Sequence, residues 1–130
     1  MDMHDESVLT RPADTTVAFH LLAERDFQAC RELERELAEQ ASLEGKATIL
    51  LCEHPPLITV GRQGSWGDIR LTADQLRRRR LRVQWVSRGG GTILHGPGQL
   101  AIYPVVPLDW FGWSEQELER RLLEGIAAAL

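Results

Sequence analysis

The sequence has few cysteines, a single lysine and no long apolar run, and each scarcity excludes a class of protein. Its two cysteines, Cys30 and Cys52, have neither metal-binding nor redox spacing, so we expect buried packing residues and no metal site. No segment reaches the run of about 18 apolar residues that a membrane span requires. The acidic, polar N-terminus also lacks the basic start and apolar middle of a signal peptide, which favours a cytoplasmic protein with no membrane-embedded part.

Positive charge is carried almost entirely by arginine. Lys46 is the only lysine among 15 lysine and arginine residues, and the formal net charge is −4. Because an acidic chain is poorly suited to bulk binding of nucleic acid, no nucleic-acid partner is expected. Arg77–Arg80, followed by Arg82, form a basic cluster. Two interpretations of this cluster stay open: a solvated helix face, or a contact surface for an acidic protein partner.

The pattern of apolar residues predicts one folded domain that follows a flexible tail at residues 1–15. Hydrophobic residues make up 43% of the 130 residues, enough to bury a core. Spacings of three and four residues predict a helix over 26–43, which Gly45 ends. Its apolar stripe is Phe27, Cys30, Leu33, Leu37 and Ala41. Strands are predicted at 17–22, 47–52, 57–60, 82–86 and 100–106, and loops at 61–68 and 108–113.

Two further helices are predicted from capping boxes, in which two residues three positions apart cap a helix start. Thr72 with Gln75 begins a short helix, and Ser114 with Glu117 begins the last one. The apolar stripe of the last helix is Leu118, Leu122 and Ile126. Two strands flank Pro55-Pro56 as in a hairpin. The pattern therefore favours the α+β class, with a mixed β-sheet flanked by helices.

The last predicted helix reaches Leu130 without a glycine, a proline or a basic final turn. This ending predicts a fold truncated at its C-terminus, with 16–130 as the N-terminal portion of a single domain. The alternative is a helix that frays or docks on a partner.

The segment Ser87–Gln99 is rich in glycine and lies between two predicted strands. Glycines are costly to order, and chains keep them where backbone must approach a ligand closely. Successive backbone N–H groups can bind an anion or an oxyanion, and Arg88 and His95 add a fixed charge and a titratable group. The alternative is a glycine-rich hairpin with a structural histidine. Neither a dinucleotide fingerprint nor a P-loop is present.

Two motifs give the chain a specific resemblance. Arg88-Gly89-Gly90 followed by His95-Gly96-Pro97-Gly98-Gln99 resembles the signature of the octanoyltransferase family of lipoate biosynthesis. Upstream, Glu53–Arg62 is similar to a second block of that family, and Leu100–Pro104 downstream also resembles it. The likeness covers roughly residues 50 to 106.

The resemblance implies the fold of the biotin and lipoate protein ligases. It also implies transfer of an octanoyl group from acyl carrier protein to a lysine of a lipoyl domain, without a cofactor. Acceptors in the family are lipoyl domains of 2-oxoacid dehydrogenases and the glycine cleavage H protein. A cysteine thiolate takes the acyl chain as a thioester, and a nearby lysine lowers its pKa.

The family's substrate-binding loop matches eight residues of this chain: Arg88, Gly89, Gly90, Gly91, Thr92, Ile93, Leu94 and His95. By this resemblance Arg88 and His95 orient the loop and the thioester carbonyl. The glycines let backbone reach the acyl head group, and Ile93 and Leu94 line the acyl tunnel.

The chain departs from the family at two places. Thr92-Ile93-Leu94 replaces a Val-Thr-Tyr segment, which changes the groups available for substrate contact. Neither lysine nor cysteine follows His95, where the family has its catalytic pair. We therefore expect no catalytic residue in this chain, and expect it to be inactive alone.

Two other functions stay open. One is an ATP-dependent lipoate or biotin protein ligase, although that reaction usually uses a lysine after the glycine-rich loop. The other is a non-catalytic fragment that binds acyl or protein partners. His54 is similarly open, as a functional group or as a strand-ending histidine with structural hydrogen bonds.

Overall fold

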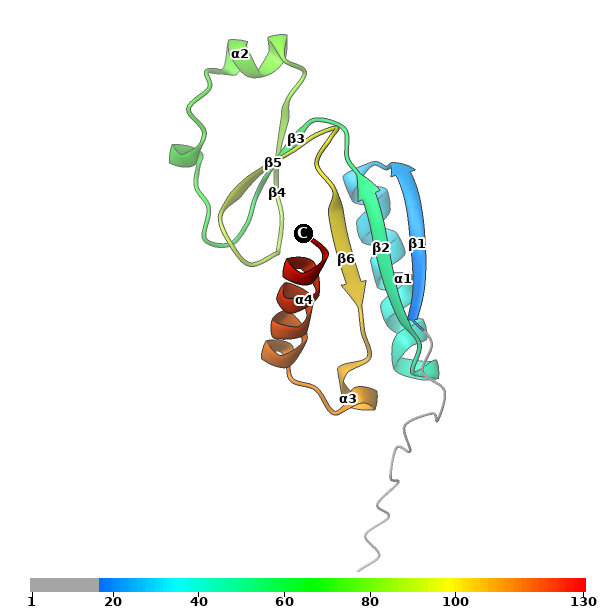
Figure 1. Ribbon diagram of the computed structural model, residues 1–130. Helices are drawn as coiled ribbons and strands as arrows, with labels where there is room; N and C mark the ends of the chain where they lie inside the picture. Colours follow the sequence, from blue (N-terminus) through cyan, green and yellow to red (C-terminus); the bar gives the residue numbers. More distant parts are fainter. Residues whose placement is uncertain (1–16) are drawn as a thin grey trace, which may run out of the picture.

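The structure is a computed structural model that describes residues 17–130 (Figure 1). The tail predicted at residues 1–15 lies outside the described residues. The elements are β1 (Val17–Glu24), α1 (Phe27–Glu44), β2 (Ala47–Glu53), β3 (Leu57–Val60), the 3₁₀ helix η1 (Trp66–Asp68), α2 (Ala73–Arg78), β4 (Arg82–Trp85), β5 (Thr92–His95), β6 (Ala101–Val105), α3 (Leu108–Phe111) and α4 (Glu115–Ala129).

The described strands form two three-stranded sheets, in the orders β1-β2-β6 and β4-β3-β5. Each sheet is mixed: β2 pairs parallel with β1 and antiparallel with β6, and β3 pairs parallel with β4 and antiparallel with β5. The predicted α+β class is confirmed. The predicted hairpin around Pro55-Pro56 is wrong, because β2 and β3 belong to different sheets and the two prolines redirect the chain from one sheet to the other.

Helix α1 forms the main core with one face of the β1-β2-β6 sheet. The Asp26 side chain accepts a hydrogen bond from the Ala29 N–H at its start, and Gly45 ends it in the left-handed conformation at φ 66°. The core consists of Cys30, Leu37, Ala41, Leu50, Cys52 and Val105. Both cysteines are free and buried, as predicted.

Helix α4 lies on the opposite side of this sheet from α1 (Figure 1). Leu118 and Leu122 face Ile49 and Pro104 across a gap of about 190 Å³, and no α4 residue is fully buried. Ser114 caps the helix by accepting from the Glu117 N–H at 3.1 Å. The Glu117 carboxylate pairs with arginines further along α4, so only half of the predicted capping box forms.

Two short helices lie within predicted loops. η1 interrupts the loop predicted at 61–68, and α3 interrupts the one predicted at 108–113. Gly112 ends α3 at φ 64°, and the Trp110 indole N–H donates to the Ser42 carbonyl, 3.3 Å away near the end of α1. The capping box predicted at Thr72 and Gln75 is confirmed, and it begins α2. No helix among residues 17–130 is long and apolar enough to cross a membrane.

Candidate functional site

The glycine-rich segment is fastened by backbone to the residues that follow β3. The N–H groups of Gly61, Arg62 and Gln63 donate to the carbonyls of Gly91, Arg88 and Gly90, at 2.9 to 3.0 Å. In return the Gln63 side-chain carbonyl accepts from the Gly90 N–H. This close approach explains Gly61, because a Cβ there would lie 2.5 Å from the Gly90 oxygen. The segment is thus an ordered loop whose last part continues as β5.

Arg88 stabilises this loop from within. Its Nη2 donates to the Thr59 carbonyl at 3.0 Å and to the Thr59 hydroxyl at 2.8 Å, and its Nη1 donates to the Gly89 carbonyl at 2.9 Å. The guanidinium therefore joins the loop to the middle of β3. Its Nε is buried and has no hydrogen-bond partner among the described residues.

His95 meets the same threonine from the neighbouring strand. Its Nε2 lies 2.8 Å from the Thr59 hydroxyl, and the imidazole is buried. That hydroxyl accepts from Arg88 and still has its own proton, which it can donate to Nε2 of a neutral His95. Burial lowers the pKa of His95 below its usual value, and the nearby His54 and Arg88 lower it further.

Thr59 therefore holds together the two residues that the sequence singles out, and sequence reasoning missed it. It is fully buried between Ile58 and Val60 in an otherwise apolar strand. A buried threonine in such a strand needs a hydrogen-bond partner, and that is the signal that could have identified it.

His54 also lies beside this network. Its Nδ1 is 2.7 Å from the Arg25 carbonyl and its Nε2 is 2.7 Å from the Tyr103 hydroxyl. Its ring meets that of His95 edge-on, with centroids 5.7 Å apart. The structural interpretation of His54 accounts for both of its ring nitrogens, and it places two buried imidazoles in contact below the loop.

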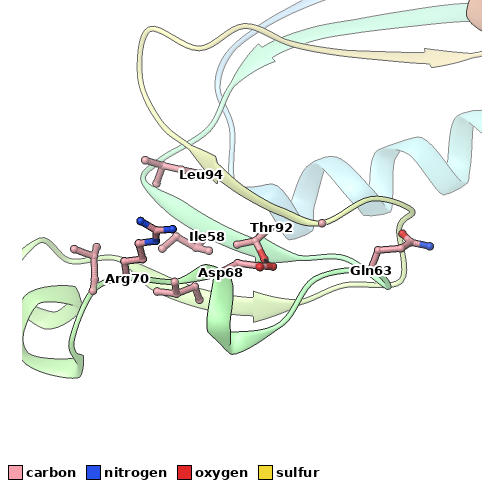
Figure 2. Close-up of a pocket in the computed structure, with 9 residues that line it drawn as sticks. Ile58, Gln63, Asp68, Arg70, Thr92 and Leu94 are labelled. Carbon is pink, nitrogen blue, oxygen red and sulfur yellow. Dashed lines mark hydrogen bonds between the residues drawn. The ribbon is translucent and has the colours of Figure 1, made fainter.

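A pocket of about 520 Å³ opens on the other face of β3 and β5 (Figure 2). One part of its wall is apolar, formed by Ile58, Ile69, Leu71 and Leu94. The other part is polar, formed by Gln63, Asp68, Arg70, Gly91 and Thr92. A pocket with one apolar wall and one polar wall suits a ligand that has a hydrocarbon part and a polar head.

Some of the predicted site residues line this pocket and others do not. Gly91, Thr92 and Leu94 line it, and Leu94 also lines an adjoining pocket of about 390 Å³ with His95 and Gly96. Ile93 is directly opposite Thr59 in the strand register, on the other face, and it lines neither pocket. Arg88, Gly89 and Gly90 also lie outside the two linings and build the loop behind them.

Asp68 fixes the polar end of the pocket and was not identified from the sequence. Its carboxylate accepts from the Thr92 hydroxyl at 2.8 Å and from the Ser65 N–H at 2.9 Å. The Ser65 hydrogen bond and then that from Thr92 lower the pKa of this exposed carboxyl. Figure 2 shows Asp68 and Thr92 together between Gln63 and Arg70. The segment after η1 thereby completes a pocket that β3 and β5 begin.

Neither cysteine has the properties of a nucleophile. Burial, aided by the other thiol, raises the pKa of Cys30 to about 12, and burial also raises the pKa of Cys52. Reactive cysteines are instead accessible and have lowered pKa values. Both thiols lie in the core beneath α1, and neither lines the 520 Å³ pocket.

Comparison with known proteins identifies a family over most of the chain. Residues 26–130 match the lipoyl protein ligase A/B catalytic domain. An octanoyltransferase of Chloroflexus aggregans is 36% identical over 117 residues, which are 88% of this chain and 52% of that protein. Octanoyltransferases of Geotalea uraniireducens and Caldicellulosiruptor saccharolyticus are 45% and 43% identical, over 58% and 50% of this chain. The matches cover 32% and 28% of those two proteins, so the chain corresponds to about half or less of each relative's length.

Two solved structures of a T. acidophilum protein described as a lipoate protein ligase are also similar. One has a TM-score of 0.48 at 18% identity and covers 68% of this chain and 38% of that protein. The other, with bound lipoic acid, has a TM-score of 0.45 at 14% identity and covers 69% and 37%.

Proposed function

The chain belongs to the lipoyl protein ligase A/B catalytic-domain family, and from that premise we propose that it carries the acyl-binding part of an octanoyltransferase. The reaction moves an octanoyl group from acyl carrier protein to a lysine of a lipoyl domain. The acceptor is a lipoyl domain of a 2-oxoacid dehydrogenase or the glycine cleavage H protein, in the cytoplasm. The observation that carries this proposal is the two-sided pocket between β3, β5 and residues 69–71.

The apolar wall suits a medium-length acyl chain. Ile58 and Leu94 are directly opposite each other on β3 and β5, and Ile69 and Leu71 face them from the segment after η1. Removing about six methylenes from water, at about 0.8 kcal/mol each, contributes about 5 kcal/mol of binding. Leu94 is 58% exposed without a ligand, so its contact surface is available to a ligand.

The polar wall suits the thioester head of the donor. Gly91 and Thr92 lie where the loop becomes β5, so backbone and a hydroxyl flank the place where the apolar wall ends. Arg70 contributes a cation to the same lining. In this proposal Arg88 and His95 position the loop through Thr59 and do not touch the carbonyl themselves.

The chemical step needs a nucleophile that this chain does not offer at the loop. No lysine or cysteine follows His95, and Cys30 and Cys52 are buried thiols of raised pKa. We expect the 130-residue chain to bind the octanoyl donor and to transfer nothing. Transfer of octanoate to a lipoyl domain by this chain alone would contradict that part of the proposal.

The binding experiment compares two exposed leucines. Octanoyl-acyl carrier protein is titrated into the wild-type chain, a Leu94→Asp variant and a Leu100→Asp variant, and binding is measured by calorimetry. Leu94 lines the pocket, whereas Leu100 is 60% exposed and lines none of the pockets described above. We expect Leu94→Asp to weaken binding about 10-fold or more, because it places a carboxylate against the acyl chain, and Leu100→Asp to change it little. Equal losses in both variants would reject the pocket as the acyl site.

The same samples distinguish this function from the two alternatives, an ATP-dependent ligase and a non-catalytic binding fragment. An ATP-dependent ligase would release pyrophosphate with ATP and free octanoate, and it would not require acyl carrier protein. A module that binds only proteins would bind acylated and unacylated carrier protein equally. We expect no pyrophosphate and a clear preference for the acylated carrier.

The partner part of the proposal rests on the arginines at the end of α2. Arg77 and Arg78 have side chains 79% exposed, and both pair only with the exposed Asp74 among the described residues. Such surface pairs contribute little to folding, so the arginines are available to an acidic carrier protein. Binding of the carrier should therefore weaken steeply with salt, and a salt-insensitive affinity would exclude this surface.

A further inference from the structure

Three potential metal ligands converge in the core although the sequence separates them. The Sγ atoms of Cys30 and Cys52 are 3.9 Å apart, and Cys52 Sγ is 3.8 Å from His54 Nε2. All three ligand atoms lie within 4.8 Å of one another, and all three residues are buried. Helix α1 supplies the first residue, β2 the second, and the turn after β2 the third.

The spacing is close to that of a tetrahedral zinc site. Zinc bonds of about 2.3 Å to sulfur and about 2.0 to 2.1 Å to nitrogen place two sulfurs about 3.8 Å apart and a sulfur and a nitrogen about 3.6 Å apart. The Cys30–Cys52 and Cys52–His54 distances agree with these values to within about 0.2 Å. An ion could therefore be bound if these side chains move toward it.

His54 already has the orientation that a metal ligand needs. Its Nδ1 is 2.7 Å from the Arg25 carbonyl, which only accepts, so Nδ1 carries the proton and Nε2 carries the lone pair. Metal-binding histidines are usually fixed in this way by a carbonyl or carboxylate on the other ring nitrogen. The Tyr103 hydroxyl oxygen is 2.7 Å from the same Nε2 and occupies its lone pair, so the Tyr103 side chain must move aside for an ion to bind there.

The charges of an occupied site would balance. Two thiolates balance a 2+ charge, so the occupied site would be neutral in a core from which water is excluded. Glu34 lies one helical turn after Cys30, and its Oε1 is buried without a hydrogen-bond partner among residues 17–130. That oxygen is not among the ligand atoms that lie within 4.8 Å of one another, so we assign it no bond to the ion.

We propose that Cys30, Cys52 and His54 bind one Zn²⁺ ion that joins α1 to the end of β2. Binding forms two zinc–thiolate bonds and one zinc–imidazole bond, and the two thiol protons leave to solvent. The ion would hold His54, which lies beneath the glycine-rich segment. Zinc binding does not depend on the acyl transfer proposed above.

The test uses the reduced, metal-free 130-residue chain. Co²⁺ is titrated as a spectroscopic probe and is then displaced by Zn²⁺. We expect one ion per chain, a thiolate-to-cobalt charge-transfer absorption that Zn²⁺ abolishes, and a higher unfolding temperature with Zn²⁺. A folded chain without that absorption would overturn the proposal.

Variants locate the site. Cys52→Ala should weaken binding about 100-fold or more, whereas His20→Asn, on β1 outside the cluster, should leave it unchanged. If Cys52→Ala fails to fold, alkylation of the wild-type chain replaces it: Zn²⁺ should protect both thiols. Unprotected thiols, equal affinity in Cys52→Ala, or a Cys30–Cys52 disulfide that forms readily while no ion binds would each contradict a metal site.

Discussion

The two sheets of this protein have the same strand directions and differ in what connects their parallel strands. In the first sheet, α1 joins β1 to β2 and packs on them. In the second, η1 and the six-residue α2 join β3 to β4, and no residue of either helix is buried. The first connection builds a core. The second leaves the 520 Å³ pocket between residues 69–71 and the sheet, so the short crossover helix is what leaves this space open.

The buried groups differ as well. Between α1 and the first sheet the core is mainly aliphatic and thiol. In the second sheet the centre of β3 is a polar network, in which Thr59 meets Arg88 and His95. An aliphatic core tolerates approximate positions, whereas a buried hydrogen-bond network requires a fixed register. The second sheet is therefore suited to holding a loop in one geometry.

Truncation of Leu50 tests the first sheet and should have the largest effect. Leu50 is fully buried at the centre of β2, so Leu50→Ala should lower the free energy of unfolding by about 2 to 5 kcal/mol. Leu21→Ala is the matched control on β1, because Leu21 is 83% exposed and its loss should cost little. Denaturant unfolding measures both, and equal losses would show that α1 does not define this core.

A methyl group at Gly61 tests the loop of the second sheet. Its Cβ would lie 2.5 Å from the Gly90 oxygen and 2.6 Å from Arg88 Nη1, so Gly61→Ala should lower stability by about 3 kcal/mol, near the upper end for overpacking. Gly91→Ala is the control, since a Cβ there meets nothing within 4 Å. The loop is not fastened as described if both alanines are tolerated alike.

Removal of the Thr59 hydroxyl tests the polar network directly. Thr59→Val keeps the shape and leaves His95 Nε2 without its partner, which should cost about 2 kcal/mol. Thr59→Ser keeps the hydroxyl and loses one methyl, which should cost about 0.8 kcal/mol. A larger loss for serine than for valine would mean that packing, and not hydrogen bonding, holds β3.

The sequence predicts α1 and the bounds of most strands better than it predicts strand pairing, because its signals are local. The stripe from Phe27 to Ala41 and the glycine at 45 predict α1 to within one residue at each end. Strand partners are set by contacts between distant segments, which explains why the run around Pro55-Pro56 resembles a hairpin and yet divides two sheets. α3 has only four residues, too few for a periodic pattern.

The candidate site is likewise predictable only where its signals are local. The motif from Arg88 to His95 identifies the loop, but it does not show which side chains face a ligand. The register between β3 and β5 decides that: it puts Leu94 with Ile58 on the pocket face and Ile93 with Thr59 on the other. Asp68 and Ile69 lie more than twenty residues before β5, and only the folded crossover brings them to the pocket.

The pH dependence of stability gives the smallest expected effect. It distinguishes the titratable group of the second sheet, His95, from that of the core beneath α1, Glu34. Burial lowers the pKa of His95, so below its ordinary value of about 6.5 the unfolded chain takes up a proton before the folded chain does. Stability from His95 is therefore complete above about pH 6.5 and is lost as pH falls toward the lowered value. The effect is small because it involves one proton over a limited pH range.

The pH dependence that Glu34 contributes, in the core beneath α1, has the opposite sign. Burial raises its pKa, so its contribution is lost as pH rises above the ordinary value of 4.5. Unfolding of the wild type and of His95→Gln, each measured in chelator from about pH 8 to about pH 5, separates the two groups. The difference between the curves should diminish toward acid if His95 is held neutral by Thr59, and a constant difference would mean that His95 is protonated equally in the folded and unfolded chains.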